Sequence, residues 1–172
     1  YGLNHLNHNG LVSKVIGGNY GLQIPFMKNL IVGNKIEAYN FPQGILSQMC
    51  RTMASKQPGI ITKVGLYTYM DPRIEGGKMN KKTKKNLIEL IKIGGQEYLF
   101  YKAPRPDIAI IRGTSIDKDG YVYMEHEATT REDLSIAQAV HNNGGVVICQ
   151  FKKFIKKKYT NPHLAKIPSF LI

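Results

Sequence analysis

Residues suited to binding or positioning a substrate follow the ends of the expected strands in this sequence. A β-branched run at residues 60–64 stops at Gly65, and Tyr67 and Thr68 begin a glycine-containing loop that continues to residue 80. In open α/β sheets, ligands bind at the carboxyl ends of the strands, where such a loop brings its backbone close to the ligand. We therefore expect Gly65, Tyr67 and Thr68 to line a substrate pocket.

Two further segments are expected at the same kind of position. Gly18 and Asn19 follow a short strand, where the absence of a side chain lets a ligand or a neighbouring chain approach the backbone. The segment lacks the GxGxxG pattern of nucleotide-binding loops, and a tight connection explains it equally well. Gln43 opens a helix after Pro42, so its amide can face the sheet edge. It either positions a substrate by hydrogen bonding or bonds only the local backbone.

No residue of this chain is expected to act as a nucleophile or a metal ligand. Glu75 precedes two glycines and is accessible, but a surface ion pair with Arg73 explains it better, because such pairs are common. His5 and His8 are three residues apart and have no third ligand nearby, so a metal site is not expected. The other histidines also lack an evident catalytic partner: His126, His141 and His163.

The composition is that of an ordinary globular protein. Of the 172 residues, 42% are hydrophobic and 9% aromatic, enough for one domain with its own core. No apolar run approaches the roughly 20 residues that cross a bilayer, and no secretory signal is visible, so no membrane partner is expected. Cys50 and Cys149 are too few for a disulfide framework, which favours a reduced, cytoplasmic setting. Because the first residue is not Met, we expect the chain to start partway through a longer protein.

The net charge of +12 arises partly from two runs of lysine. A polyanionic partner is one explanation, since clustered lysines attract phosphate-bearing ligands. Two solvated loops are the other explanation. Neither run alternates with aromatic residues that could stack on bases, so nucleic acid is not an expected partner. The runs consist of Lys81, Lys82, Lys84 and Lys85, and of Lys152, Lys153, Lys156, Lys157 and Lys158.

The first third of the chain alternates strands with helices. Hydrophobic spacing predicts strands at residues 11–16, 36–41 and 60–64, with helices at residues 24–32 and 42–56 between them. Short connections in this order favour a parallel sheet covered by helices.

The rest of the chain has a different pattern. Residues 87–93 and 97–102 flank Gly94-Gly95 and predict a β-hairpin. Residues 107–112 are nearly all apolar, which predicts a strand buried on both faces. Further along, we expect strands at 121–125 and 146–151 and a helix at 133–143.

Several short motifs, each weak alone, are distributed along the chain. They are Val15-Ile16-Gly17-Gly18, Lys35-Ile36-Glu37-Ala38-Tyr39-Asn40, Pro42-Gln43-Gly44, the loop at 63–80, Glu97-Tyr98-Leu99-Phe100-Tyr101-Lys102-Ala103, Ile111-Arg112-Gly113-Thr114, Leu134-Ser135-Ile136-Ala137-Gln138-Ala139-Val140 and Pro162-His163-Leu164-Ala165-Lys166-Ile167-Pro168. In this order and spacing, they together resemble the amino-terminal, α-type domain of family I coenzyme A transferases, most closely the propionate and acetate CoA-transferases.

The resemblance implies an α/β fold with an open, mainly parallel sheet flanked by helices. Residues 1–172 would form a single partial domain, with a β-hairpin insertion at 85–105 and a basic tail at 152–172 that closes it. The implied reaction moves CoA between a short-chain acyl-CoA (acetyl, propionyl, butyryl or acetoacetyl) and a free carboxylic acid through a glutamyl-CoA thioester. CoA would be a co-substrate, and no permanently bound cofactor is expected. Gln43 and Gly44 would lie close to the reacting carboxylate.

The chain also departs from the family pattern. The nucleophilic glutamate of the family belongs to a second domain, in a Glu-Asn-Gly or similar motif that does not occur here. The family's glycine-rich oxyanion loop lies upstream of this sequence. We therefore expect no transferase activity from this chain alone, which would need a complementary half (a β-type domain or subunit) and would form a homo-oligomer. A non-catalytic remnant that acts as a binding or interaction module is the alternative.

Overall fold

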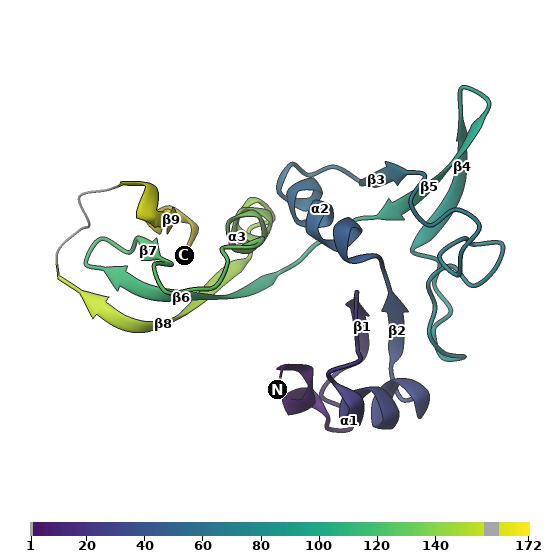
Figure 1. The fold of residues 1–172 in the computed structure, drawn as a ribbon, viewed down its shortest axis with the longest axis horizontal. Coiled ribbons are helices and arrows are strands. Elements are labelled where there is room, and N and C mark those ends of the chain that lie inside the picture. Colours follow the sequence, from purple (N-terminus) through teal and green to yellow (C-terminus); the bar gives the residue numbers. More distant parts are fainter. Residues whose placement is uncertain (1, 157–161) are drawn as a thin grey trace. The chain divides into compact units, whose positions relative to one another are not determined.

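The computed structural model describes residues 2–156 and 162–172 (Figure 1). The chain divides into two compact units. The first contains the described residues up to Gln48 together with Gly59–Lys102, and the second contains Met49–Pro58 together with the described residues from Ala103 onward. Among the described residues, no helix is long and apolar enough to cross a membrane.

The first unit begins with a parallel pair of strands, β1 (Lys14–Gly17) and β2 (Glu37–Asn40). A 3₁₀ turn at Gly2–Leu6 precedes them, and the connection between them is the short helix α1 (Ile24–Phe26) continued by a π-helical turn at Met27–Val32. Proline near the start of α1 suits the first helical turn, where its missing N–H costs nothing. Buried residues of this crossover and of β2 form one core cluster: Tyr20, Phe26, Leu30, Ile31, Ile36 and Ala38.

Helix α2 (Gln43–Ala54) follows β2 directly, and the chain then enters an antiparallel sheet in the first unit. This sheet has the order β3 (Gly59–Thr62), β5 (Gln96–Lys102), β4 (Ile88–Ile93). The hairpin predicted around Gly94-Gly95 is confirmed, since β4 pairs with β5 across these two residues of positive φ. The prediction that the strand at 60–64 joins a parallel sheet with β1 and β2 is wrong. This strand, β3, instead pairs antiparallel with β5.

Buried aromatic rings join the two sheets of the first unit. Tyr39 and Phe41 pack edge to face with ring centroids 6.2 Å apart, and Phe41 packs against Tyr101 of β5 at 5.3 Å. The Tyr101 hydroxyl donates a hydrogen bond to the carbonyl oxygen of Val64, 2.9 Å away, just before the glycine loop begins. Burial raises the pKa of Tyr101 to about 12, so its hydroxyl stays protonated and remains a donor.

The second unit is built around a parallel pair, β6 (Ile108–Asp117) and β8 (Val146–Ile155). Strands β7 (Val122–Tyr123) and β9 (Ala165–Ile167) extend the sheet in the order β8-β6-β7-β9. Helix α3 (Asp133–Asn142) forms part of the connection to β8 and packs on one face of the pair (Figure 1), where Ala137 and Val140 share a core cluster with Ala109, Ile111 and Val147. Single 3₁₀ turns at Pro162–Leu164 and Ser169–Leu171 flank β9.

The other face of the β6–β8 pair is apolar and exposed. Ile108 is 60% exposed, Ile110 78%, Val146 60% and Ile148 50%. The register places Ile108 beside Val146 and Ile110 beside Ile148, so the four side chains form one patch. The prediction of a strand buried on both faces is therefore wrong for these residues, because α3 covers only one side.

The α/β class expected from the sequence is confirmed, and its sheets are mixed rather than uniformly parallel. Residues 85–105 contain the β4–β5 hairpin, and their status as an insertion stays a prediction. The basic tail at 152–172 also stays a prediction. Lys152 and Lys153 are exposed in β8 and Lys156 is exposed just after it, whereas Lys157 and Lys158 lie outside the described residues.

The exposed aliphatic patch predicts that the purified chain associates with itself, because burying this patch removes apolar surface from water. We expect the average mass in sedimentation equilibrium to rise with protein concentration, and Ile110→Lys to reduce the rise, since a charge resists burial. Ile93→Lys is the control, because Ile93 is 49% exposed beside the hairpin turn. A native chain that stays monomeric at every concentration contradicts the prediction.

Candidate functional site

The carboxyl edge of the β1–β2 pair brings Gly18 and Gln43 together. Gly17 lies opposite Asn40, and the backbone N–H of Phe41 donates to the carbonyl oxygen of Gly17 at 2.9 Å, so both strands end at one level. A Cβ atom added to Gly18 would overlap Oε1 of Gln43 and lie 3.2 Å from the carbonyl oxygen of Phe41. Glycine at position 18 therefore leaves the space that the Gln43 side chain occupies.

Asn19 and Gly44, the residues that follow Gly18 and Gln43, differ in their surroundings. Asn19 is exposed, and its Oδ1 accepts a hydrogen bond from the N–H of Gly21 at 2.7 Å, which forms a local turn. Gly44 is exposed in the first turn of α2, and nothing lies within 4 Å of the position that its Cβ would take. The surface beside Gln43 is therefore open at Gly44.

Asn40, the last residue of β2, was not singled out in the sequence. Its Nδ2 donates to the hydroxyl of Tyr69 at 2.8 Å, and its backbone N–H donates to the carbonyl oxygen of Gly77 at 2.9 Å. Its Oδ1 is buried and has no partner among the described residues. Exchanging the Nδ2 and Oδ1 positions of Asn40 would instead leave Nδ2 buried without a partner among the described residues. A polar residue closing a short strand next to Phe-Pro-Gln is the signal that could have identified it.

The glycine loop turns sharply where β3 gives way to it. Gly65 has φ +95°, and a Cβ there would lie 2.8 Å from Cβ of Met70 and 2.5 Å from the hydroxyl of Tyr101. The hydroxyl of Thr68 donates to the carbonyl oxygen of Gly65 at 2.8 Å and accepts from the N–H of Met70 at 3.2 Å. Gly65 and Thr68 therefore shape the turn itself, and the Thr68 hydroxyl is engaged within it.

Tyr67 is the exposed point of this turn. Its side chain is 74% exposed, and its backbone has φ +61°, a conformation that bulky residues rarely adopt. Its N–H donates to Oδ2 of Asp71 at 3.1 Å, and its ring lies against the guanidinium of Arg73, with 5.2 Å between Cζ and the ring centroid. The predicted site residues Gly65, Tyr67 and Thr68 thus form one turn, which Asp71 braces.

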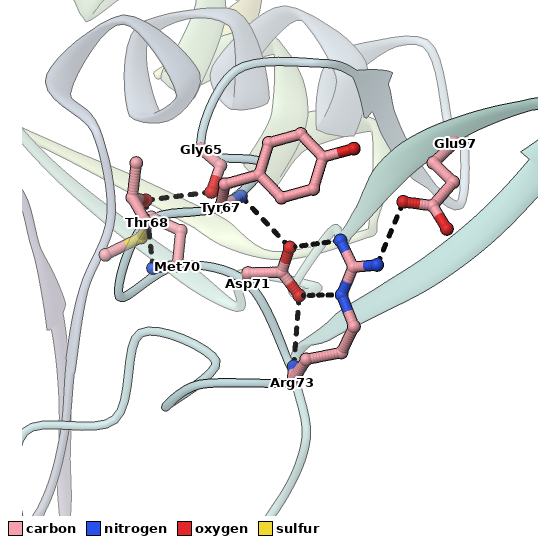
Figure 2. Close-up of polar contacts among 7 residues, drawn as sticks. All are labelled: Gly65, Tyr67, Thr68, Met70, Asp71, Arg73 and Glu97. Atoms are coloured by element: carbon pink, nitrogen blue, oxygen red, sulfur yellow. Dashed lines mark hydrogen bonds and ion pairs between the residues drawn. The ribbon is translucent and has the colours of Figure 1, made fainter.

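Asp71 is a buried carboxylate, 1% exposed, at the centre of a polar network (Figure 2). Arg73 donates to both of its oxygens, from Nε at 2.9 Å and from NH2 at 2.7 Å, and the backbone N–H of Arg73 also donates to it at 3.0 Å. The remaining arm of Arg73 reaches Oε2 of Glu97 on β5 at 2.9 Å. The Arg73 hydrogen bonds hold the pKa of Asp71 well below its usual range, against the opposing effect of burial, and Asp71 and Glu97 raise the pKa of Arg73.

Arg73 and Glu75 do not form the surface pair expected from the sequence. Arg73 pairs with Asp71 and Glu97 because both carboxylates lie within reach of its planar fork, and Glu75 is exposed. The sequence signal that could have indicated this pairing is Asp71, two positions before Arg73 and next to Pro72. No group of three or more His, Cys, Asp or Glu side chains able to hold a metal ion occurs within the described part of the chain.

The second half of the loop runs along the free edge of β2. Tyr39 forms an antiparallel bridge with Lys78, and the N–H of Met79 donates to the carbonyl oxygen of Ala38 at 3.0 Å. The buried hydroxyl of Thr83 accepts from the N–H of Ala38 at 2.8 Å, and Nζ of Lys82 donates to the carbonyl oxygen of Lys35 at 2.6 Å. The Lys82 ammonium is therefore anchored before the amino-terminal end of β2, away from Gln43.

Comparison with known proteins identifies the family of the chain. The profile described as Coenzyme A transferase matches residues 1–172. The chain belongs to the coenzyme A transferase family. Acetate CoA-transferase YdiF of Escherichia coli O157:H7 is 47% identical over 171 residues, which cover 99% of this chain and 32% of the relative. Caffeate CoA-transferase of Acetobacterium woodii is 43% identical over the same length, with 99% and 32% covered.

A solved structure of a CoA-transferase has the same fold. The crystal structure of YdiF from Escherichia coli O157:H7, as a thioester complex with CoA, matches with a TM-score of 0.94 at 46% identity and covers 100% of this chain and 33% of that chain. This chain thus spans about a third of the length of the curated relatives it matches. The resemblance to the amino-terminal domain of family I CoA transferases is confirmed.

Gly65→Ala is expected to destabilise the chain by more than about 1 kcal/mol, because alanine strains the positive φ and its Cβ meets Tyr101 and Met70. The matched substitution Gly44→Ala is expected to stabilise it by about 0.5 kcal/mol, since the helical site is open and alanine favours helix. Urea unfolding followed by circular dichroism measures both. Equal effects of the two substitutions contradict the prediction.

Asp71→Asn is expected to lower the free energy of unfolding by about 1.5–3 kcal/mol at neutral pH, the usual range for hydrogen bonds to charged groups. The folded-state pKa of Asp71 lies below its unfolded value of about 3.9, so the ionised carboxylate stabilises the fold fully above that value. The stabilisation is lost as the pH falls through the folded pKa, so the difference between native and variant chains should shrink below about pH 4.

Urea unfolding at several pH values tests this dependence. Asp107→Asn, at an exposed aspartate, is the control and should have little effect at any pH. A deficit of Asp71→Asn that is as large at pH 2 as at pH 7 contradicts the assignment of a charged Asp71.

Proposed function

We propose that this chain forms part of the active site of an acyl-CoA:carboxylate CoA-transferase. The enzyme would move CoA between a short-chain acyl-CoA, such as the acetyl, propionyl, butyryl or acetoacetyl thioester, and a free carboxylic acid. The observation that carries the proposal is the meeting of Gln43 and Gly18 at the carboxyl edge of β1 and β2, in a chain that matches the family along its whole length. CoA is a co-substrate, and no permanent cofactor is invoked.

The proposed reaction proceeds by exchange of acyl groups on a glutamate of the second, β-type half. The glutamate carboxylate attacks the thioester carbonyl and the C–S bond breaks. This step forms an acyl-glutamyl anhydride and releases CoA thiolate. The thiolate then attacks the glutamyl carbonyl, which releases the first carboxylic acid and forms a glutamyl-CoA thioester. The acceptor carboxylate then attacks the glutamyl-CoA thioester, which forms a second anhydride and releases CoA thiolate again. The thiolate attacks the acceptor's carbonyl in this anhydride, so that CoA ends on the acceptor and glutamate is regenerated. Covalent catalysis of this kind divides one difficult exchange into easier steps.

This chain contributes hydrogen-bond donors to that chemistry. The Gln43 side-chain amide and the backbone N–H groups of Gln43 and Gly44 lie at the start of α2, where N–H groups have no partner within the helix. The N–H groups of Ile45 and Leu46 donate to the carbonyl oxygen of Pro42 and are not counted among these donors. Such donors favour negative charge, both on a glutamate carboxylate and on the oxyanion that forms at each acyl transfer. Gln43 is exposed and Gly44 leaves open space beside it, so a carboxylate has access.

The remaining assignments concern the walls of the site. Gly18 provides room for Gln43, Asn19 shapes the adjoining turn, and Gly65, Tyr67 and Thr68 form the turn proposed to face the acyl group. The complementary half supplies the nucleophile, so the chain alone is inactive. The assembled enzyme is proposed to be a cytoplasmic homo-oligomer.

The test uses a reconstituted enzyme, in which this chain replaces the matching segment of E. coli acetate CoA-transferase YdiF. We expect it to transfer CoA from acetyl-CoA to propionate, and we expect the isolated chain not to. Gln43→Ala should lower kcat/KM on the order of 10- to 100-fold through loss of a donor to the developing charge. Gln138→Ala, which removes an exposed helical glutamine elsewhere, should leave the rate unchanged.

Other outcomes decide against the proposal in distinct ways. A folded reconstituted enzyme without transfer activity, when YdiF is active in the same assay, favours a non-catalytic binding module. Thioester exchange by the isolated chain overturns the assignment of the nucleophile to the other half. Equal rates for Gln43→Ala and Gln138→Ala remove Gln43 from the site.

A further inference from the structure

The network behind Tyr67 does more than close a turn. The turn has its own hydrogen bonds, between Thr68 and the backbone of Gly65 and Met70. Arg73 adds a connection to Glu97, 24 residues away on β5, and lies against the Tyr67 ring. Strained backbone at an exposed residue persists only where the surroundings enforce it, and such positions cluster at functional sites. The network thus holds one exposed aromatic ring in a fixed place.

The charge of the network excludes an anion as its ligand. Arg73 is the single cation, and both Asp71 and Glu97 already bond it, so the three side chains together carry a net negative charge. A phosphate or a carboxylate approaching Arg73 would meet these two carboxylates at the same time. The ligand of this surface is therefore not the charged end of a substrate.

Several apolar and aromatic side chains of the loop reach solvent, among exposed polar ones such as Lys63, Thr68 and Glu75. Tyr67 is 74% exposed, Tyr69 46%, Ile74 57% and Val64 51%. The hydroxyl of Tyr69 is tied to Asn40, three residues before Gln43, so the loop adjoins the strand end that leads into α2. Exposed aromatic and aliphatic side chains on a loop that adjoins the proposed hydrogen-bond donors suit a substrate that carries a carboxyl or thioester group at one end and hydrocarbon at the other.

We propose that Asp71, Arg73 and Glu97 are positioning residues that hold the Tyr67 ring as a wall for the hydrocarbon part of the acyl group. Through this wall they set the preference of the enzyme among acyl groups of different length. The inference rests on the proposed transferase function and adds to it the residues that determine specificity. Arg73 suits the task because its planar fork binds Asp71 with two parallel hydrogen bonds while its face stacks on an aromatic ring.

The test measures the ratio of kcat/KM for butyryl-CoA to that for acetyl-CoA in the reconstituted enzyme. Tyr67→Ala removes the wall and should raise this ratio by about tenfold, the lower end of what a change of pocket size does to discrimination. Tyr67→Phe keeps the ring and should leave the ratio within about twofold of native. Glu97→Ala loosens Arg73 and should raise the ratio about threefold, because a small misplacement of a contacting group already costs discrimination.

The hairpin offers a matched control for Glu97. Glu89 on β4 forms an ion pair with Lys102 in the same sheet, and within the described part of the chain it has no hydrogen bond or ion pair with Asp71, Arg73 or Glu97. Glu89→Ala should therefore leave the ratio unchanged. Arg73→Lys keeps the charge but loses the fork and the flat stacking face, and should change the ratio as Glu97→Ala does.

The outcomes separate this inference from the function on which it rests. If Glu97→Ala and Tyr67→Ala lower both kcat/KM values in the same proportion, the network is merely structural and the inference is overturned, while the transferase function stands. If Glu89→Ala changes the ratio of kcat/KM values as much as Glu97→Ala does, the inference is also overturned. If the unsubstituted reconstituted enzyme transfers no CoA, the proposed function itself fails.

Discussion

The backbone of β2 needs hydrogen-bond partners on both of its edges, and this requirement organises the first unit. β1 supplies one edge in parallel register, and the loop after β3 supplies the other through Lys78, Met79 and the side chain of Thr83. A buried strand with an unsatisfied edge would cost the desolvation of each free N–H and C=O group. The loop is therefore a structural partner of β2, in addition to its proposed part in the site. Its position next to the Gln43 edge follows from this pairing.

Asp71 plays the corresponding part inside the loop. A carboxylate that is 1% exposed is tolerated only when its oxygens are fully bonded, and here two backbone N–H groups and the fork of Arg73 surround it. Because the same arginine reaches Glu97, the conformation of the loop is coupled to the β4–β5 hairpin. Through Arg73, the geometry at Tyr67 is thus connected to Glu97 of β5.

Elements with strong local signals were predictable from the sequence, and their partners were not. Helices α2 and α3 and the Gly94-Gly95 hairpin depend on neighbouring residues, and all appear close to the expected bounds. The pairing of β3 with β5 depends on residues about 40 positions apart, which hydrophobic periodicity cannot report. Likewise, an all-apolar run is compatible with burial on both faces, but only the placement of α3 decides which face of β6 is covered. For the site, strand-end position indicated Gln43 and Gly18, whereas Asn40 and the partners of Arg73 required the three-dimensional structure.

The anchoring of Lys82 has a consequence for how an anionic molecule experiences this chain. Asn80 bonds the carbonyl oxygens of Ile31 and Ile36, and Lys82 bonds that of Lys35, so the Lys82 ammonium is held before the start of β2 while Gln43 lies past its end. Four strand residues span about 13 Å, which exceeds the roughly 8 Å Debye length of physiological salt. The Lys82 charge and the Gln43 donor thus lie toward opposite ends of one short strand. In dilute buffer the field of Lys82 extends along the strand, and in physiological salt it is largely screened before it reaches Gln43.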